Sequence, residues 1–201
     1  MANLTGPARA RYVQGMFARI AHRYDLMTRV MTAGQDVRWR REVIQRAALP
    51  AHGRLLDLGA GTGDLARQAL RQSPTISALA ADFTLEMMQA GKRRPEKQLS
   101  EDQRLAWSAA DAQALPLPDN AFDAVVSGYL LRNVSNLALS LSEQHRVLKP
   151  GGRMVALDTA PPLHNKLEPF IRFHLHTVIP TLGQWITGQS DAYRYLPDST
   201  E

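Results

Sequence analysis

The fold of this chain is decided by the stretch Arg54-Leu55-Leu56-Asp57-Leu58-Gly59-Ala60-Gly61-Thr62-Gly63-Asp64. An apolar run ends there in an acid and is followed by three glycines at alternate positions. The next residues are apolar at helical spacing, so the pattern predicts a buried strand, a tight turn and a helix. Glycine lets the chain turn sharply and lets a ligand approach bare backbone. The amide groups that open the helix would face that ligand.

The spacing of the glycines distinguishes this turn from a dinucleotide-binding turn, which reads G-x-G-x-x-G. Here the third glycine comes one residue early, and Asp64 stands where the last glycine is expected. A carboxylate suits a ligand with a positive centre better than a pyrophosphate, and Asp57 adds a second negative charge. We therefore predict S-adenosyl-L-methionine, which carries a sulfonium and an ammonium. The alternatives are a nicotinamide oxidoreductase and a purely structural turn.

The composition is that of an ordinary globular domain. The chain has 201 residues, of which 44% are apolar and 21% charged, and these values fit one domain with a sizeable core. It has no cysteine, so we expect no disulfide, no thiolate nucleophile and no metal site. No apolar run has the length of a membrane span, and no signal peptide is recognisable, so we expect a cytoplasmic protein. A net charge of +5 is weak evidence for an anionic partner.

Strands and helices alternate between residues 53 and 158. Apolar runs predict strands near 53–58, 76–82, 105–112, 122–127 and 153–158. The alternation favours a Rossmann-like, doubly wound α/β sheet of about five parallel strands. Ligands bind such sheets beyond the carboxyl ends of the strands. The polar residues expected at those ends are Asp57, Asp82, Asp111, Ser127 and Asp158.

Two of these positions, each with the residue that follows it, have the chemistry to bind a nucleoside. Asp82 lies 21 residues after Gly61, where an acid can accept two hydrogen bonds from a ribose diol. Phe83 could flank the adenine. Asp111 could accept the adenine amino group, and the amide of Ala112 could reach a ring nitrogen. We expect the backbone of Gly59 and Gly61 to line the same site.

The flanking segments are expected to be helical. The divisions of the single domain are a helical arm at 1–50, a cofactor-binding core at 51–158 and a substrate-side segment at 159–201. Within the arm, residues 1–8 are expected to be disordered, and Asp36 is expected to cap the third helix. The arm could cover the carboxyl ends of the strands, with an ordinary packing layer as the alternative. The apolar stretch from Leu163 to Leu182 could lie over the site or face an apolar partner.

The chain resembles the menaquinone/ubiquinone biosynthesis C-methyltransferases. The glycine turn and Lys149-Pro150-Gly151-Gly152, the expected end of a helix, are shared by many class I methyltransferases, and the other motifs are narrower. The motifs that carry the resemblance are Phe17-Ala18-Arg19-Ile20-Ala21-His22-Arg23-Tyr24-Asp25-Leu26-Met27, Trp39-Arg40, Leu56 to Asp64, Ala114-Leu115-Pro116, Leu131-Arg132-Asn133-Val134 and Arg146 to Gly152. The resemblance implies methyl transfer from S-adenosyl-L-methionine to a ring carbon of a demethylmenaquinol-like, prenylated hydroquinone.

The resemblance also implies roles for individual residues. Thr62, Asp82, Asp111 and Ala112 match cofactor-contacting positions of the family. We expect Arg132 to stabilise the substrate phenolate, because arginine keeps its charge, with a structural ion pair as the alternative. We expect Tyr24 of the arm to orient that group or to close the site. His174 and His176 are alternative bases; they lie two residues apart, so a metal pair is not expected.

The chain departs from the family pattern in two places. Gly128 precedes the aromatic Tyr129 where many relatives have serine, and Ser127 lies one residue earlier as the candidate cofactor contact. The family also continues beyond a Tyr-Leu-Pro-Asp-Ser segment with a helix and two strands, whereas this chain stops at Glu201. The fifth strand would then be an unpaired edge. We expect either a fragment or an edge-pairing homo-oligomer.

Two other functions are compatible with the sequence. A methyltransferase of the same fold could act on a soluble small molecule, or the chain could bind the cofactor without transferring a methyl group. A prenylated substrate would need an apolar path, which 163–186 could supply in peripheral contact with the inner membrane face. Nucleic acid is not an expected partner, because the sequence has no basic and aromatic strip.

Overall fold

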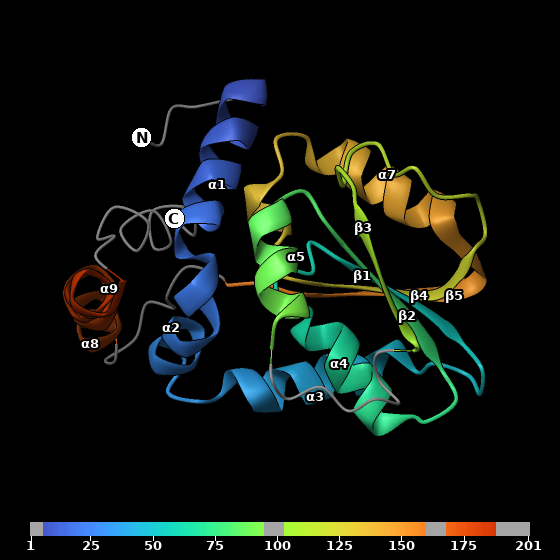
Figure 1. Ribbon diagram of the computed structural model, residues 1–201, viewed down its shortest axis with the longest axis horizontal. Helices are drawn as coiled ribbons and strands as arrows, with labels where there is room; N and C mark the ends of the chain where they lie inside the picture. The colour runs from blue at the N-terminus through green and yellow to red at the C-terminus, as the bar shows by residue number, and fades with distance from the viewer. Residues whose placement is uncertain (1–5, 95–102, 160–167, 188–201) are drawn as a thin grey trace.

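The structure is a computed structural model that describes residues 6–94, 103–159 and 168–187. A sheet of five parallel strands in the order β3-β2-β1-β4-β5 runs through it (Figure 1). The bounds are β1 Arg54–Leu58, β2 Ser77–Asp82, β3 Leu105–Ala109, β4 Phe122–Gly128 and β5 Leu148–Leu157. The predicted Rossmann-like, doubly wound sheet is confirmed. The strand before the glycine turn lies at its centre, so its carboxyl end is flanked on both sides.

Helices cover both faces of the sheet, as alternating strands and helices require. On one face lie α3 (Asp36–Ala47) and α4 (Asp64–Gln72), whose apolar side chains pack on the strands. The opposite face packs against α7 (Leu137–Val147) and the loop that follows β3. The short helix α5 (Leu85–Lys92) follows β2 and contacts the first helix of the arm.

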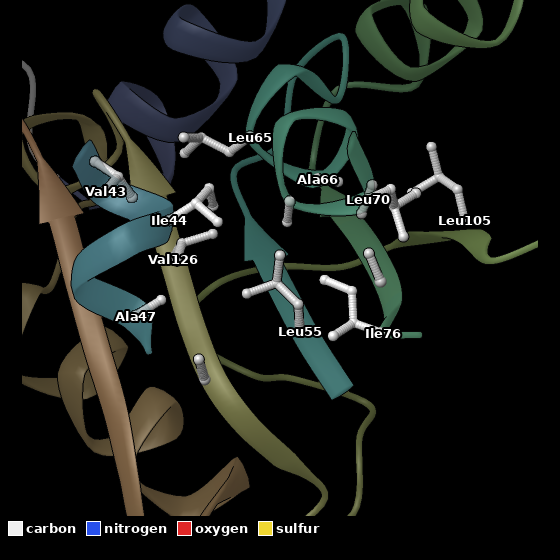
Figure 2. Packing of buried hydrophobic residues seen from close by; sticks show 14 residues of the cluster. Val43, Ile44, Ala47, Leu55, Leu65, Ala66, Leu70, Ile76, Leu105 and Val126 are labelled. Atoms are coloured by element: carbon white, nitrogen blue, oxygen red, sulfur yellow. The ribbon is translucent and has the colours of Figure 1, made fainter. Parts of the chain in front are cut away.

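Figure 2 shows why α3 belongs to the core although it precedes the first strand. Val43 and Ile44 of α3 lie next to Val126 of β4, while Leu65 and Leu70 of α4 extend the same cluster along the sheet. All of these side chains are buried. Burying one valine, leucine or isoleucine side chain stabilises the fold by about 1.5–3 kcal/mol. The last helix of the predicted arm is therefore fixed to the sheet.

The rest of the arm packs against the C-terminal helices instead of the sheet. It consists of α1 (Gly6–Ile20), the 3-10 turn η1 (Ala21–Arg23) and α2 (Tyr24–Met31). Met16, Ile20 and Met27 are fully buried in a cluster with Ile179 of α9. The C-terminal helices are α8 (Glu168–Phe173), the π-helical turn η3 (His174–Val178) and α9 (Ile179–Thr187). In Figure 1, α8 and α9 lie on the far side of the arm from the sheet.

Several predicted boundaries were wrong for identifiable reasons. The fifth strand begins at Leu148, so the expected helix end at Lys149-Pro150-Gly151-Gly152 lies within β5. Leu148 pairs with Phe122, and the register then shifts before Ala124, which accommodates the proline and the glycines. The third strand ends at Ala109, and Asp111 forms an isolated bridge with Ala114.

The arm holds two further corrections. Residues 6–8, expected to be disordered, form the first turn of α1, whereas 1–5 lie outside the described residues. Asp36 makes no capping hydrogen bond to the start of α3. It is buried instead, with ion pairs to Arg29 (3.1 Å) and Arg40 (3.3 Å). A buried carboxylate needs such partners.

A chain of charges joins the arm to the glycine turn. Arg40 of α3 pairs with Asp64, the first residue of α4, and Arg94 pairs with both Asp64 and Asp25 of α2. The hydroxyl of Thr62 in the turn donates to Asp25 at 2.6 Å and accepts from Arg94 at 3.0 Å. Five side chains from three parts of the sequence thereby hold α2 against the turn.

We predict that Arg40→Met lowers the free energy of unfolding by about 2–4 kcal/mol, because it removes one of the two cations that each of Asp36 and Asp64 pairs with. The measurement is urea unfolding followed by circular dichroism. The matched control is Arg46→Met on the same helix, which removes an exposed pair with Glu42 at 2.7 Å. That control should cost at most about 0.5 kcal/mol. Equal losses in the two variants would contradict the role assigned to the charge chain.

Candidate active site

The turn after β1 depends on its glycines. Gly59, Gly61 and Gly63 have φ values of 66°, 55° and 81°, in the left-handed region that glycine enters without strain. A Cβ atom on Gly59 would lie 2.8 Å from the side chain of Leu130. The turn therefore follows a path that other residues could not take, and it brings bare backbone to the carboxyl end of the sheet.

Two adjoining cavities lie at this end of the sheet. The first, about 820 Å³ and open to solvent, extends over the carboxyl ends of β2 and β3, and its outer wall is formed by Val13, Gln14 and Phe17 of α1. The second, of about 420 Å³, lies against the start of α4. The residues that line both are Tyr24, Gly59, Gly61, Gly128 and Tyr129. These five mark the junction of the two cavities.

The first cavity contains the residues predicted to bind a nucleoside. Asp82, Phe83, Asp111 and Ala112 all line it. Asp82 is buried, and burial raises the pKa of its carboxyl group. Its oxygens accept hydrogen bonds from the amides of Gly61 and Thr84, each at 2.7 Å. These bonds fix the carboxylate beside the glycine turn and leave it lone pairs for a ligand.

The side chains around Asp82 differ in how they are held. One oxygen of Asp111 accepts from the amide of Gln113 at 2.9 Å. Phe83 is 43% exposed, and its carbonyl accepts from the side chain of Gln14 at 2.9 Å. The arm thus contacts the same segment that would flank an adenine ring.

Asp57 is a buried carboxylate with one oxygen unused. Its Oδ2 accepts from the amide of Ala66 at 2.9 Å, whereas its Oδ1 has no hydrogen-bond partner within the described part of the chain. Burial raises the pKa of the Asp57 carboxyl group to about 7. The residue lines the second cavity. A cation placed there would satisfy the free oxygen and return the group to its charged form.

The expectation that Asp64 offers free negative charge to a ligand needs correction. Burial acts to raise the pKa of its carboxyl group, but the charges of Arg40 and Arg94 outweigh burial and lower it. Asp64 lines the second cavity as part of an ion network. Its charge is compensated by protein groups, so Asp57 is the better candidate for meeting a ligand cation.

Two tyrosines face the junction of the cavities. Burial raises the pKa of the Tyr24 hydroxyl to about 12, so this phenol stays neutral at physiological pH. Tyr129 follows β4 with φ of 59°, an uncommon backbone for a tyrosine. Such a conformation costs about 1–3 kcal/mol and persists where surrounding contacts impose it.

Arg132 lies beside this junction but does not line either cavity. Its Nε atom is 3.4 Å from Asp158, and another guanidinium nitrogen donates to Thr159. The guanidinium also lies over the ring of Tyr129, 5.5 Å from its centroid. The structural ion pair that was the alternative role for Arg132 is therefore present. The charge nevertheless lies beside the junction of the cavities, where a substrate phenolate would need it.

Other predicted residues have different surroundings. Thr62 lines the second cavity, with its hydroxyl committed to Asp25 and Arg94. Ser127 is buried in β4, lines neither cavity, and its hydroxyl has no hydrogen-bond partner among the residues described. His174 lies 3.3 Å from the carbonyl of Met31, within the packing of the arm. The side chain of His176 is outside the description, and the described residues hold no cluster of metal ligands.

The sequence suggested that the arm covers the carboxyl ends of the strands, but it did not identify Val13, Phe17 or Tyr129 as residues that line a cavity. Val13 and Phe17 have the helical spacing of core residues, and only the docking of α1 shows that they face a cavity. Tyr129 attracted notice only as the aromatic that follows Gly128, since no local pattern predicts where its hydroxyl lies.

Comparison with known proteins agrees with this geometry. The sequence profile described as the ubiE/COQ5 methyltransferase family matches residues 6–201. The ubiquinone/menaquinone biosynthesis C-methyltransferase UbiE of Desulfotalea psychrophila is 47% identical over 188 residues, covering 94% of this chain and 74% of that protein. The demethylmenaquinone methyltransferase of Thermus thermophilus is 42% identical over 186 residues, covering 92% of this chain and 83% of that protein.

Solved structures agree at the level of the fold. A protein of Methanococcus maripaludis, assigned as an S-adenosyl-L-methionine-dependent methyltransferase, superposes with a TM-score of 0.63 at 21% identity. The match covers 89% of this chain and 80% of that one. The sheet is thus of the class I methyltransferase type, and the family match extends over nearly the whole chain. The resemblance drawn from the sequence motifs is confirmed: this chain belongs to the ubiE/COQ5 methyltransferase family.

Proposed function

We propose that this chain is an S-adenosyl-L-methionine-dependent C-methyltransferase that methylates a ring carbon of a demethylmenaquinol-like, prenylated hydroquinone. The observation that carries the proposal is the pair of adjoining cavities at the carboxyl end of the sheet, with the half-used carboxylate of Asp57 in one and Asp82 in the other. Family membership and the names of the relatives from Desulfotalea psychrophila and Thermus thermophilus support the same reaction and substrate class.

The residues present fit this cofactor. Asp57 offers a free carboxylate oxygen in a buried place, which suits the ammonium of the methionine end. Asp82 and Asp111, with Phe83 and the amide of Ala112, would hold the ribose and adenine in the first cavity. The backbone of Gly59 and Gly61 would pass beneath the ligand at the junction, with Thr62 closing the turn. Ser127 is a weaker candidate, since it contributes to neither cavity wall.

The reaction needs a nucleophilic ring carbon held in line with an electrophilic methyl group, which S-adenosyl-L-methionine supplies when bound. Loss of the neighbouring hydroxyl proton to water raises the electron density on that carbon. A carbon–carbon bond then forms as the carbon–sulfur bond breaks, and the electron pair stays on sulfur. The ring carbon next loses its proton, which restores aromaticity. Holding the two reactants in this geometry removes much of the entropic barrier.

Tyr24 and Arg132 are the residues we assign to the substrate oxygen. With a pKa of about 12, Tyr24 is a neutral donor at the junction of the cavities and can hold that oxygen in place. Arg132 supplies permanent positive charge close by, partly offset by Asp158. His174, the alternative base, packs against α2 rather than lining either cavity. Of the predicted arm, α1 and α2 would close the site, because α3 is fixed to the sheet. Of the predicted substrate-side segment, α8 and α9 would meet the substrate beyond the arm.

The direct test is transfer of labelled methyl from S-adenosyl-L-methionine to a chemically reduced demethylmenaquinone, with product identified by mass spectrometry. We expect methylation of a ring carbon. Cofactor binding without any methylated product would instead support a binding module, and equal turnover of tail-free acceptors would support a soluble substrate. Tight binding of NADH, followed by its fluorescence, would favour an oxidoreductase and overturn the proposal.

We predict that Arg132→Ala lowers kcat by about 100-fold or more, the range seen when one oxyanion-stabilising donor is lost. The dissociation constant for S-adenosyl-L-methionine, measured by calorimetry, should change less than about threefold because Arg132 does not line the cofactor cavities. Arg132→Lys is the matched control that keeps the charge and should retain part of the activity. Loss of cofactor binding in Arg132→Ala would refute the assigned role.

Asp57 generates a prediction about stability and pH. Because its folded-state pKa of about 7 lies above the usual value of 3.8, the folded protein holds a proton that the unfolded chain has lost. Stability should therefore fall as pH rises from about 4 to about 7, by up to about 1.4 kcal/mol per unit. Asp57→Asn should remove this slope in urea unfolding, and it should also weaken cofactor binding.

The control for this measurement is Asp123→Asn. Burial acts to raise the pKa of the Asp123 carboxyl group, but hydrogen bonds from Lys149 and the amide of Arg54 outweigh it and lower the pKa. Its contribution to stability should grow as pH rises through the acid range, with the sign opposite to that of Asp57. The same pH slope in the parent and in Asp57→Asn would count against a buried, protonated Asp57.

We further propose that α8 and α9 contact a membrane surface peripherally. Trp185 of α9 is 86% exposed and Phe173 of α8 is 60% exposed. Indole rings favour the headgroup region of a bilayer, and the net charge of +5 favours anionic lipid. Among the described helices, none is both long and apolar enough to cross a bilayer. Contact of this kind would bring a prenylated substrate near the arm.

We predict that the parent protein floats with vesicles of phosphatidylethanolamine and phosphatidylglycerol, and that Trp185→Ser reduces the bound fraction about fivefold, because about 1 kcal/mol or more of indole burial is lost. The control is Leu139→Ser, which removes a 45% exposed apolar side chain from α7, away from α8 and α9 in Figure 1. No flotation of the parent, or equal reduction in both variants, would contradict the membrane contact.

A further inference from the structure

The backbone of Tyr129 is fixed from both sides. Its amide donates to the carbonyl of Leu157, at the end of β5, at 2.7 Å. Its own carbonyl accepts from the side chain of Asn133 at 2.8 Å. With φ of 59°, the residue turns sharply out of β4. These contacts hold the side chain at the junction of the two cavities, which it helps to line.

The hydroxyl of Tyr129 is buried and unused. It has no hydrogen-bond partner within residues 6–94, 103–159 and 168–187, although no solvent reaches it. The other phenol at the junction, Tyr24, has the side chain of Thr28 as a partner. A buried hydroxyl without a partner is costly unless a ligand or water completes it. Tyr129 therefore lines both cavities and carries a buried donor that no described residue uses.

The groups around this hydroxyl keep it in its neutral form. Burial raises the pKa of the Tyr129 phenol, and the charges of two arginines only partly oppose it. The charged and titratable groups that face the ring are Arg40, Arg132, Asp36, Asp158 and Tyr24. A neutral phenol is a donor to an oxygen that carries negative charge.

We propose that the Tyr129 hydroxyl donates a hydrogen bond to the substrate ring oxygen next to the methylated carbon, and so orients that carbon toward the methyl group. This inference rests on the proposed C-methyltransferase function. The first cavity, which Tyr129 helps to line, has apolar side chains in its wall, among them Phe17, Leu130 and Val134, which suit a ring and its prenyl tail. On such an acceptor, the ring oxygens are the groups that need a polar partner.

The proposed hydrogen bond favours ionisation of the ring hydroxyl and adds no proton transfer to the reaction. The ring hydroxyl gives its proton to water, and the resulting phenolate accepts from Tyr129, which keeps its own proton throughout. When the ring carbon takes the methyl group, the oxygen becomes a carbonyl, and it regains phenolate character as the ring proton leaves. A donor at this oxygen lowers the pKa of the bound ring hydroxyl.

The test is Tyr129→Phe, which keeps the ring, its contact with Arg132 and the same backbone preference. The matched control is Tyr12→Phe, which removes a phenol oxygen from α1 in the arm packing, outside both cavities. In Tyr129→Phe we expect kcat/KM for the reduced acceptor to fall about 10- to 100-fold, up to the lower limit of the range of about 100- to 1,000-fold for loss of one oxyanion donor. The acidic limb of the kcat profile should move to higher pH, because the bound hydroxyl ionises less readily.

A second readout does not require turnover. 1-Naphthol serves as a tail-free probe, bound to the protein in the presence of S-adenosylhomocysteine, and its ionisation is followed by absorbance. Its bound pKa should be about one unit higher in Tyr129→Phe than in the parent and in Tyr12→Phe. Calorimetry should give the same dissociation constant for S-adenosyl-L-methionine in all three proteins.

Two outcomes would overturn this inference. An unchanged naphthol pKa together with unchanged kcat/KM would show that the hydroxyl does not meet the substrate. Weakened binding of S-adenosyl-L-methionine with an unchanged acceptor KM would assign the hydroxyl to the cofactor instead. Absence of methyl transfer by the parent protein is a separate result, which would reject the proposed function before the variant is compared.

Discussion

The site depends on the chain of arginine and carboxylate groups that ties the arm to the glycine turn. Arg94 bridges α2 and the start of α4, and Arg40 joins that start to α3. Burying charges is costly unless each finds a partner, so these groups fit only when α2 lies against the turn. That placement brings Tyr24 to the junction of the cavities. Without α2 in this position, the glycine turn would lack one wall of the site at the end of the sheet.

The sheet and the location of the site could be predicted because both follow from local patterns. The buried run before Asp57 and the run before Asp82 read as strands, and parallel strands place their carboxyl ends on the same edge. The acids at those ends therefore converge with no knowledge of loops or contacts. The cavities confirm that this edge is hollow, and Asp82 and Asp111 line the same one.

The ion pairs, the start of β5 and the position of Tyr129 could not be predicted, because they depend on contacts between residues far apart in the sequence or on an unusual backbone. Asp64 and Arg94 are 30 residues apart, and Arg132 and Asp158 are joined across a strand, so no local spacing revealed either pair. The start of β5 at Leu148 was missed because a proline and two glycines normally end an element, whereas here a register shift absorbs them. Tyr129 shows the same limitation, since its position follows from a left-handed backbone that tyrosine seldom adopts.

Two carboxylates beside the turn have different roles: Asp64 stabilises the fold, and Asp57 is left to bind a ligand. Burial raises the pKa of Asp57, while the arginines beside Asp64 outweigh burial and lower its pKa. Asp64 therefore stays charged and serves the fold, whether or not a ligand is present. Asp57 holds a proton near neutral pH until a cation arrives, and ligand binding then supplies the missing partner. In the empty protein, a charged Asp57 would lower the free energy of unfolding, because the buried charge has no partner, whereas the protonated form avoids most of that cost. The site therefore favours a positively charged ligand, which stabilises the ionised carboxylate.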